Sequence, residues 1–143
     1  YPKKFEKFTP TCLTERLQDC ETKYIVNAYD NIIHYTDFFL NSLIEKLKMN
    51  EEKFDPMMIY VSDHGESLGE GGVYLHAMPY WIAPKVQKHI PFIFWGGEYF
   101  KEKIDQLRLR ENETFSHDNL FHTLIGLFNV QTKEYNKSLD LLK

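Results

Sequence analysis

Apolar positions recur at steps of three and four residues between about Glu21 and Met49, which predicts one long helix. The positions that form this face are Ile25, Tyr29, Ile32, Thr36, Phe39, Leu43 and Leu47. Pro56 ends any further helix, because proline cannot continue the hydrogen-bonded ladder. Residues 1–20 show no periodic pattern, so we expect them to be irregular.

Two short apolar runs follow, and each fits a strand buried on both faces, as in a parallel sheet. They are Met57–Val61 and Phe92–Trp95, and a loop-rich stretch with several glycines and prolines separates them. A final helix is predicted to begin after Ser116, a suitable N-cap, with Asp118 in its first turn. Its apolar face would consist of Leu120, Phe121, Leu124, Ile125 and Phe128.

This pattern predicts an α/β fold that is incomplete by itself. Two buried strands do not make a stable sheet, because each needs paired neighbours and covered faces. We therefore expect residues 1–143 to be one part of a larger α/β domain whose other strands come from elsewhere. Aromatic residues make up 15% of the chain. Those expected in the core are Phe38, Phe39, Phe92, Phe94 and Phe128.

Composition and charge narrow the classes of function. Hydrophobic residues make up 43% of the 143 residues and charged residues 27%, as in an ordinary globular domain. The net charge of -4 argues against a broad surface for nucleic acid or anionic membranes. No apolar run approaches the roughly 20 residues of a transmembrane helix, so we expect any membrane anchor upstream.

The two cysteines, Cys12 and Cys20, lie close together in a segment rich in proline and threonine. A disulfide between them would indicate an oxidising compartment. Two free thiols fit the sequence equally well. The spacing does not match the C-x-x-C pair of zinc or redox sites.

Candidate chemistry gathers directly after the first predicted strand. Asp63 and His64 offer a carboxylate and an imidazole, which are ligands that suit zinc. In open α/β sheets, sites lie at the carboxyl ends of strands, and Gly65 would let the backbone turn away there. The same residues also fit a polar turn in which Asp63 bonds to the backbone and His64 is merely exposed.

Other polar residues have simpler explanations. Packing explains His34 inside the long helix, and packing or backbone bonding explains His89. Capping of the last helix explains His117 and its neighbour Asp118. Lys85 could meet a phosphate, but a solvated loop lysine is the simpler explanation.

A longer set of motifs changes this balance. The run S-D-H-G-E-S-L-G-E, followed by Y-L-H and P-Y-W-I-A-P-K, resembles the phosphoethanolamine transferases of Gram-negative bacteria. These enzymes belong to the alkaline phosphatase and sulfatase superfamily. F-E-K-F-T-P-T-C resembles their disulfide loop, and K-H-I-P-F and S-H-D-N-L-F-H-T-L-I-G-L-F resemble a later strand and the terminal helix. Gly71 stands where an asparagine is common in the family.

The resemblance implies a fold and a place in the whole protein. The fold is part of an α/β/α sandwich, with a mostly parallel central sheet flanked by helices and the N-terminal half missing. The chain would be the C-terminal part of a single periplasmic catalytic domain. The resemblance also implies that Cys12 and Cys20 form a disulfide.

The resemblance also implies roles for four residues. Asp63 and His64 resemble two ligands of a catalytic Zn²⁺ ion. Glu66 and His76 resemble residues of the pocket that binds the transferred group. His76 would also be catalytic, either by giving a proton to a leaving oxygen or by holding a second zinc ion.

The activity implied is transfer of phosphoethanolamine from phosphatidylethanolamine to lipid A or another envelope acceptor, through a covalent threonine intermediate. That threonine and the remaining zinc ligands would lie upstream, in the N-terminal half of the same domain, so the fragment alone should be inactive. The whole protein would be anchored at the periplasmic face of the inner membrane. The alternatives are a sulfatase or phosphoglycerol transferase of the same superfamily, or a non-catalytic metal-binding module.

A separate motif concerns modification. Glu134-Tyr135-Asn136-Lys137-Ser138 fits an acidic bacterial N-glycosylation sequence, which makes Asn136 a possible glycosylation site. Asn112 begins a simple N-x-T match that lacks the acidic residue.

Overall fold

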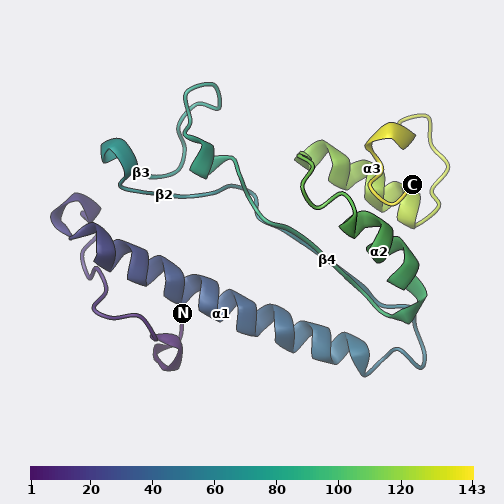
Figure 1. Cartoon of the computed structure of the whole chain (residues 1–143), viewed down its shortest axis with the longest axis horizontal. Coiled ribbons are helices and arrows are strands. Elements are labelled where there is room, and N and C mark those ends of the chain that lie inside the picture. The colour runs from purple at the N-terminus through teal and green to yellow at the C-terminus, as the bar shows by residue number, and fades with distance from the viewer.

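The computed structural model describes all residues 1–143 (Figure 1). The helices are α1 (Thr22–Lys48), α2 (Lys101–Arg108) and α3 (His117–Leu127). The strands are β1 (Met57–Val61), β2 (Ser67–Leu68), β3 (Tyr74–Leu75) and β4 (Phe92–Gly96). Short 3₁₀ turns lie at Lys3–Phe5, Leu17–Asp19, Glu70–Gly72, Lys85–Gln87, Glu98–Phe100 and Lys137–Leu139. None of the helices combines the length and the apolar character needed to cross a bilayer.

The predicted long helix is confirmed as α1, and the first 20 residues are irregular apart from two short turns. A fully buried side chain, Asn31, holds this irregular segment against α1. Its Oδ1 accepts hydrogen bonds from the backbone N–H groups of Lys7, at 2.8 Å, and Phe8, at 2.9 Å. Phe5 packs edge-on against the ring of His34, with centroids 6.0 Å apart. Packing therefore accounts for His34.

Cys12 and Cys20 form a disulfide, as the resemblance implied. The backbone N–H of Cys12 also donates to the carbonyl of Tyr24 on α1, at 3.1 Å. The closed loop is therefore fastened to the first turns of the long helix.

Both predicted core strands are confirmed, as β1 and β4, but their pairing is antiparallel rather than parallel. Met57 lies opposite Gly96, and Val61 lies opposite Phe92. An apolar run does not encode strand direction, and here residues 62–91 return the chain to the end of the sheet where β1 finishes. The pair runs between α1 on one side and α2 and α3 on the other (Figure 1). This arrangement and the structural neighbours described below support the α/β sandwich class.

The expectation that these strands are buried on both faces, with a core of phenylalanines, is wrong for this chain. Only 13 of 143 residues are buried, and Met58 is the only one on β1 or β4. Ile93 on β4 is 41% exposed, Phe39 on α1 is 58% exposed, and Phe128 after α3 is 73% exposed. The physical reason is that the helices of this chain cover these faces only in part, so most strand residues are half-buried. The apolar pattern of the sequence indicates which surfaces can be buried, but it does not indicate which part of the protein buries them.

The predicted start of the last helix is confirmed. Ser116 Oγ accepts from the N–H of Asp118 at 3.2 Å, and Asn119 Oδ1 accepts from the N–H of Ser116 at 2.9 Å. This is a reciprocal capping box. The side chains that α3 buries are polar, Asn119 and Thr123, whereas Phe121 on its expected apolar face is 52% exposed.

Candidate metal centre

The chain turns sharply where β1 ends, and this turn presents Asp63 and His64. Ser62 Oγ donates to the carbonyl of His64 at 2.8 Å, which closes the turn. The carbonyl of Ser62 accepts from Nε2 of His117 at 2.8 Å, at the start of α3. A carbonyl oxygen can only accept, so His117 must carry a proton on Nε2. The first residue of α3 therefore fixes the residue that precedes Asp63.

Glu66 and His76 are brought together by the β2–β3 hairpin. Ser67 lies opposite Leu75 in this antiparallel pair. Glu66 directly precedes β2 and His76 directly follows β3, so the register places their side chains at the same end of the hairpin. His76 Nδ1 lies 3.1 Å from Glu66 Oε2.

The turn and the hairpin meet. The ligand atoms that His64, Glu66 and His76 offer all lie within 4.8 Å of one another. The rings of His64 and His76 face each other with centroids 3.8 Å apart. Asp63 adjoins this group, because its Oδ2 lies 3.7 Å from His64 Nε2. Three of the four residues singled out in the sequence, His64, Glu66 and His76, are thus assembled at one place, and Asp63 lies beside His64.

The hydrogen bonds of both histidines suit a metal site. His64 Nδ1 lies 3.0 Å from the carbonyl of Gly65, so Nδ1 carries the proton and Nε2 is left free. His76 Nδ1 faces the carboxylate of Glu66 in the same way. Metal-binding histidines usually donate their second ring N–H to a carbonyl or a carboxylate, which fixes the ring and its tautomer. Both imidazoles are therefore held with Nε2 available as a ligand atom.

The spacing also suits zinc. Tetrahedral ligands about 2.1 Å from a zinc ion lie about 3.4 Å from each other. Asp63 Oδ2 and His64 Nε2, at 3.7 Å, are close to that spacing. The carboxylate of Asp63 and the imidazole of His64 are donors that zinc accepts readily, and His76 offers a second imidazole beside them. The residues present therefore fit a zinc ion.

The electrostatic setting keeps Asp63 ionised. A hydrogen bond from its own backbone N–H, the electrostatic interaction with the neighbouring His64 and the backbone N–H of His64 lower the pKa of the Asp63 carboxyl. Its side chain is 89% exposed, whereas that of Glu66 is only 21% exposed. The Asp63 carboxylate is thus accessible to groups outside this chain, whereas the Glu66 carboxylate is hydrogen-bonded to His76.

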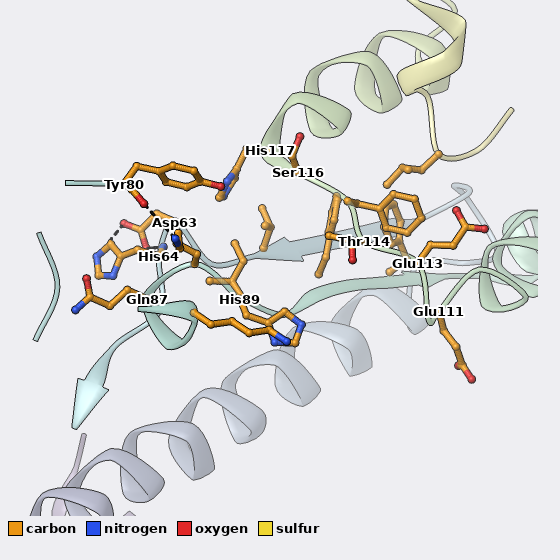
Figure 2. A pocket seen from close by; sticks show the side chains of 18 of the residues that line it. Asp63, His64, Tyr80, Gln87, His89, Glu111, Glu113, Thr114, Ser116 and His117 are labelled. Carbon is orange, nitrogen blue, oxygen red and sulfur yellow. Dashed lines mark hydrogen bonds and ion pairs between the residues drawn. The ribbon is translucent and has the colours of Figure 1, made fainter. Parts of the chain in front are cut away.

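A cavity of about 970 Å³ lies beside the cluster. Asp63 and His64 lie at one end with Gln87 nearby, and Glu111 and Glu113 lie at the other end (Figure 2). Lys85 is also on the cavity wall. This lysine, which could meet a phosphate, therefore lines the same cavity as Asp63 and His64.

The sequence did not indicate every residue that shapes this site. His117 was explained by capping, but Ser116 and Asn119 do the capping, and the His117 ring instead bonds to Ser62. Ser62 begins the S-D-H-G-E run but was given no role of its own, and Gln87 was not singled out. Each is a single polar residue in a loop, without a periodic pattern that could reveal its partners. Asn136 lies in the turn after α3, outside the cavity wall.

Comparison with known proteins defines the class. The model of the sulfatase family matches residues 1–130, and the chain belongs to this family. Within it, the chain is 44% identical to phosphoethanolamine transferase EptA of Salmonella typhimurium, over the whole chain and 27% of that relative. It is 45% identical to phosphatidylethanolamine transferase Mcr-2 of Escherichia coli, over 91% of the chain and 23% of that relative. The chain thus spans about a quarter of the length of these curated relatives.

Solved structures agree. The C-terminal periplasmic domain of phosphoethanolamine transferase EptC from Campylobacter jejuni superposes with a TM-score of 0.94 and 46% identity. The match covers the whole chain and 46% of that domain. The soluble domain of lipooligosaccharide phosphoethanolamine transferase A from Neisseria meningitidis gives a TM-score of 0.91 and 41% identity, over 99% of the chain and 44% of that domain. The chain therefore corresponds to about half of such a domain.

Proposed function

We propose that the protein containing this chain transfers phosphoethanolamine from phosphatidylethanolamine to lipid A or a similar envelope acceptor, with Zn²⁺ as cofactor. The observation that carries this proposal is the assembly of Asp63, His64, Glu66 and His76 beside one cavity, in a chain 44% identical to a phosphoethanolamine transferase. The relatives include a periplasmic domain, so we place the reaction at the periplasmic face of the inner membrane.

Asp63 and His64 are the residues that we expect to hold the zinc ion. When bound, zinc lowers the pKa of a nucleophile and neutralises charge on phosphoryl oxygens. The chain's part is to supply two ligands whose spacing already approaches that of a filled site. The other ligands and the threonine nucleophile lie, in this proposal, in the rest of the domain, so residues 1–143 alone are expected to be inactive.

His76 is the residue that we expect to move a proton. Its Nδ1–H faces Glu66, so Nε2 is free to take up a proton and then donate it to a leaving oxygen. The Glu66 carboxylate stabilises the imidazolium ion that forms meanwhile. The pair also lines the place where the transferred group would bind, close to His64.

The test uses the full-length membrane protein with phosphatidylethanolamine and lipid A. Mass spectrometry should show phosphoethanolamine added to lipid A, and removal of zinc by a chelator should stop the reaction. A zinc-loaded protein that leaves lipid A and other envelope acceptors unmodified would refute the proposal. Hydrolysis of an aryl sulfate by the same protein would instead favour the sulfatase alternative.

Variants separate the two roles. Asp63→Ala and His64→Ala should lose zinc and form no covalent intermediate. His76→Ala should keep zinc and lose about 100- to 10,000-fold in rate, the usual contribution of acid–base assistance. His122→Ala, outside the cavity wall, serves as the control. If His76→Ala loses zinc as fully as His64→Ala does, this division between metal ligand and proton carrier is wrong.

A further inference from the structure

Gln87 has an unusual position among the residues around the candidate metal centre. It ends the short turn Lys85–Gln87 and is only 6% exposed. Its side-chain Nε2 donates to Ser67 Oγ at 2.8 Å and to the carbonyl of Leu75 at 3.0 Å. Its own carbonyl accepts from the backbone N–H of Gly65 at 3.0 Å. One buried residue thus bonds to three separate points of the chain.

Each of these three points adjoins a member of the metal cluster. Gly65 lies between His64 and Glu66, Ser67 follows Glu66, and Leu75 precedes His76. We propose that Gln87 is a positioning residue: its side-chain amide sets the placement of the hairpin that carries Glu66 and His76, while its backbone carbonyl holds the turn at Gly65. This inference rests on the proposed function, because it concerns the geometry of the same site.

The chemistry requires an amide at this position. The carbonyl of Leu75 can only accept, so the group facing it must be a donor, and the two hydrogens of one Nε2 serve Leu75 and Ser67 together. Glutamate has nearly the same shape but would put an acceptor against the Leu75 carbonyl. Leucine fills similar space without any hydrogen bond, which leaves the Leu75 carbonyl without this partner.

The backbone beside His76 shows why a restraint is needed. Leu75 has φ 62° and Ala77 has φ 80°, so two non-glycine residues on either side of His76 are in the left-handed region. Such conformations are unfavourable for residues with a Cβ and persist only where surrounding contacts hold them. The bond from Gln87 to the Leu75 carbonyl is a contact of this kind.

The experiment compares Gln87→Glu and Gln87→Leu in the full-length protein. Gln131→Glu and Gln131→Leu make the same chemical changes at an exposed site after α3 and serve as matched controls. We measure zinc affinity by competition with a chelator, the visible spectrum of the Co²⁺-substituted protein, and phosphoethanolamine transfer. Loss of a residue that orients side chains around a metal typically costs about 10- to 100-fold in metal affinity or activity. Because the Gln87 amide holds the hairpin with Glu66 and His76 and not the expected ligands Asp63 and His64, we expect that loss in the transfer rate, with an altered Co²⁺ spectrum, for both Gln87 variants and not for the controls.

A milder change protects the test against misfolding. Ser67→Ala removes one of the two bonds from the Gln87 amide and should lower the transfer rate by a smaller factor, with a folded protein. If wild type binds zinc and transfers phosphoethanolamine while Ser67→Ala and the folded Gln87 variants keep its transfer rate and Co²⁺ spectrum, the inference is overturned and the proposed function stands. If wild type neither binds zinc nor transfers phosphoethanolamine, the proposed function itself fails, and this inference fails with it.

Discussion

A methyl group added at Gly65 should disturb the metal centre more than its small size suggests. The Cβ of an alanine at Gly65 would overlap the carbonyl oxygen of Val86. It would also stand 3.0 Å from the carbonyl carbon of Val86 and 3.3 Å from that of Gln87. All three atoms are backbone atoms, which cannot rotate aside as the end of a side chain can. Gly65 is not in the left-handed region, so close approach alone requires glycine here.

The expected magnitude follows from these contacts. Overpacking of this kind lowers the free energy of unfolding by about 1 to 3 kcal/mol. If the added methyl group pushes Gly65 away from the backbone of Val86 and Gln87, the hydrogen bond from Gly65 N–H to the carbonyl of Gln87 also breaks, and this bond contributes about 1 kcal/mol. The cluster residues on either side of Gly65 would move by on the order of 1 Å, and such a displacement reduces turnover about 100-fold.

The assay compares Gly65→Ala with Gly97→Ala in the full-length protein, by thermal unfolding, zinc content and transfer rate. Gly97 is a suitable control because its added Cβ would stand 3.0 Å from Glu51 Oε1, at the end of a side chain that can rotate away. Gly65→Ala should be less stable and much less active than this control. If both variants are equally stable and equally active, the close approach between Gly65 and the backbone of Val86 and Gln87 does not hold the site, and the reasoning is refuted.

Three further predictions concern regions outside the cluster. Replacing Cys12 and Cys20 together by serine should lower the free energy of unfolding, measured with urea, by about 2 to 3 kcal/mol, which is the chain-entropy value for so short a loop. The zinc content should stay unchanged. The hydrogen bond to Asp140 raises the pKa of Tyr135 from 10.0 to about 12. The stabilisation that this hydrogen bond gives the folded protein is therefore present below pH 10 and lost as pH rises towards 12. Melting temperatures of wild type and Tyr135→Phe should differ below pH 10 and converge above pH 12. Asn136 should be glycosylated in a host with the acidic-sequon machinery, and an unmodified peptide there would contradict this.

The sequence was sufficient to predict the elements with strong local signals. The periodicity of α1 is carried by seven positions, six of them apolar, and both core strands are continuous apolar runs. α2 was missed because only Ile104 and Leu107 mark its apolar side within eight residues. β2 and β3 were missed because two-residue strands are too short to show alternation. The antiparallel pairing of β1 with β4 depends on the path of the intervening loop, which no local pattern encodes.

The residues of the candidate site also fall into those with a signal in the sequence and those without one. Asp63, His64, Glu66 and His76 were found because their residue types suit metal binding and because the surrounding motif resembles a known family. The residues that hold them in place gave no such signal. His117 reaches the turn from 55 residues away, and Gln87 bonds to Ser67 from 20 residues away. These partners become visible only when the fold brings distant loops together.

The exposed apolar surface and the incomplete ligand set have one explanation. A catalytic zinc ion usually takes three protein ligands, and this chain offers Asp63 and His64 close together with an open carboxylate. Large apolar side chains such as Phe39 on α1 and Ile93 on β4 are exposed. Burying each of them would stabilise the folded domain by about 1.5 to 3 kcal/mol. Because the chain matches only 46% of the EptC periplasmic domain, we expect the rest of the domain to cover these faces and to bring the missing ligands to Asp63 in one assembly. Charged substitutions on the exposed face of α1, such as Phe39→Asp, should therefore lower zinc content in the full-length protein even though α1 contributes none of the four cluster residues.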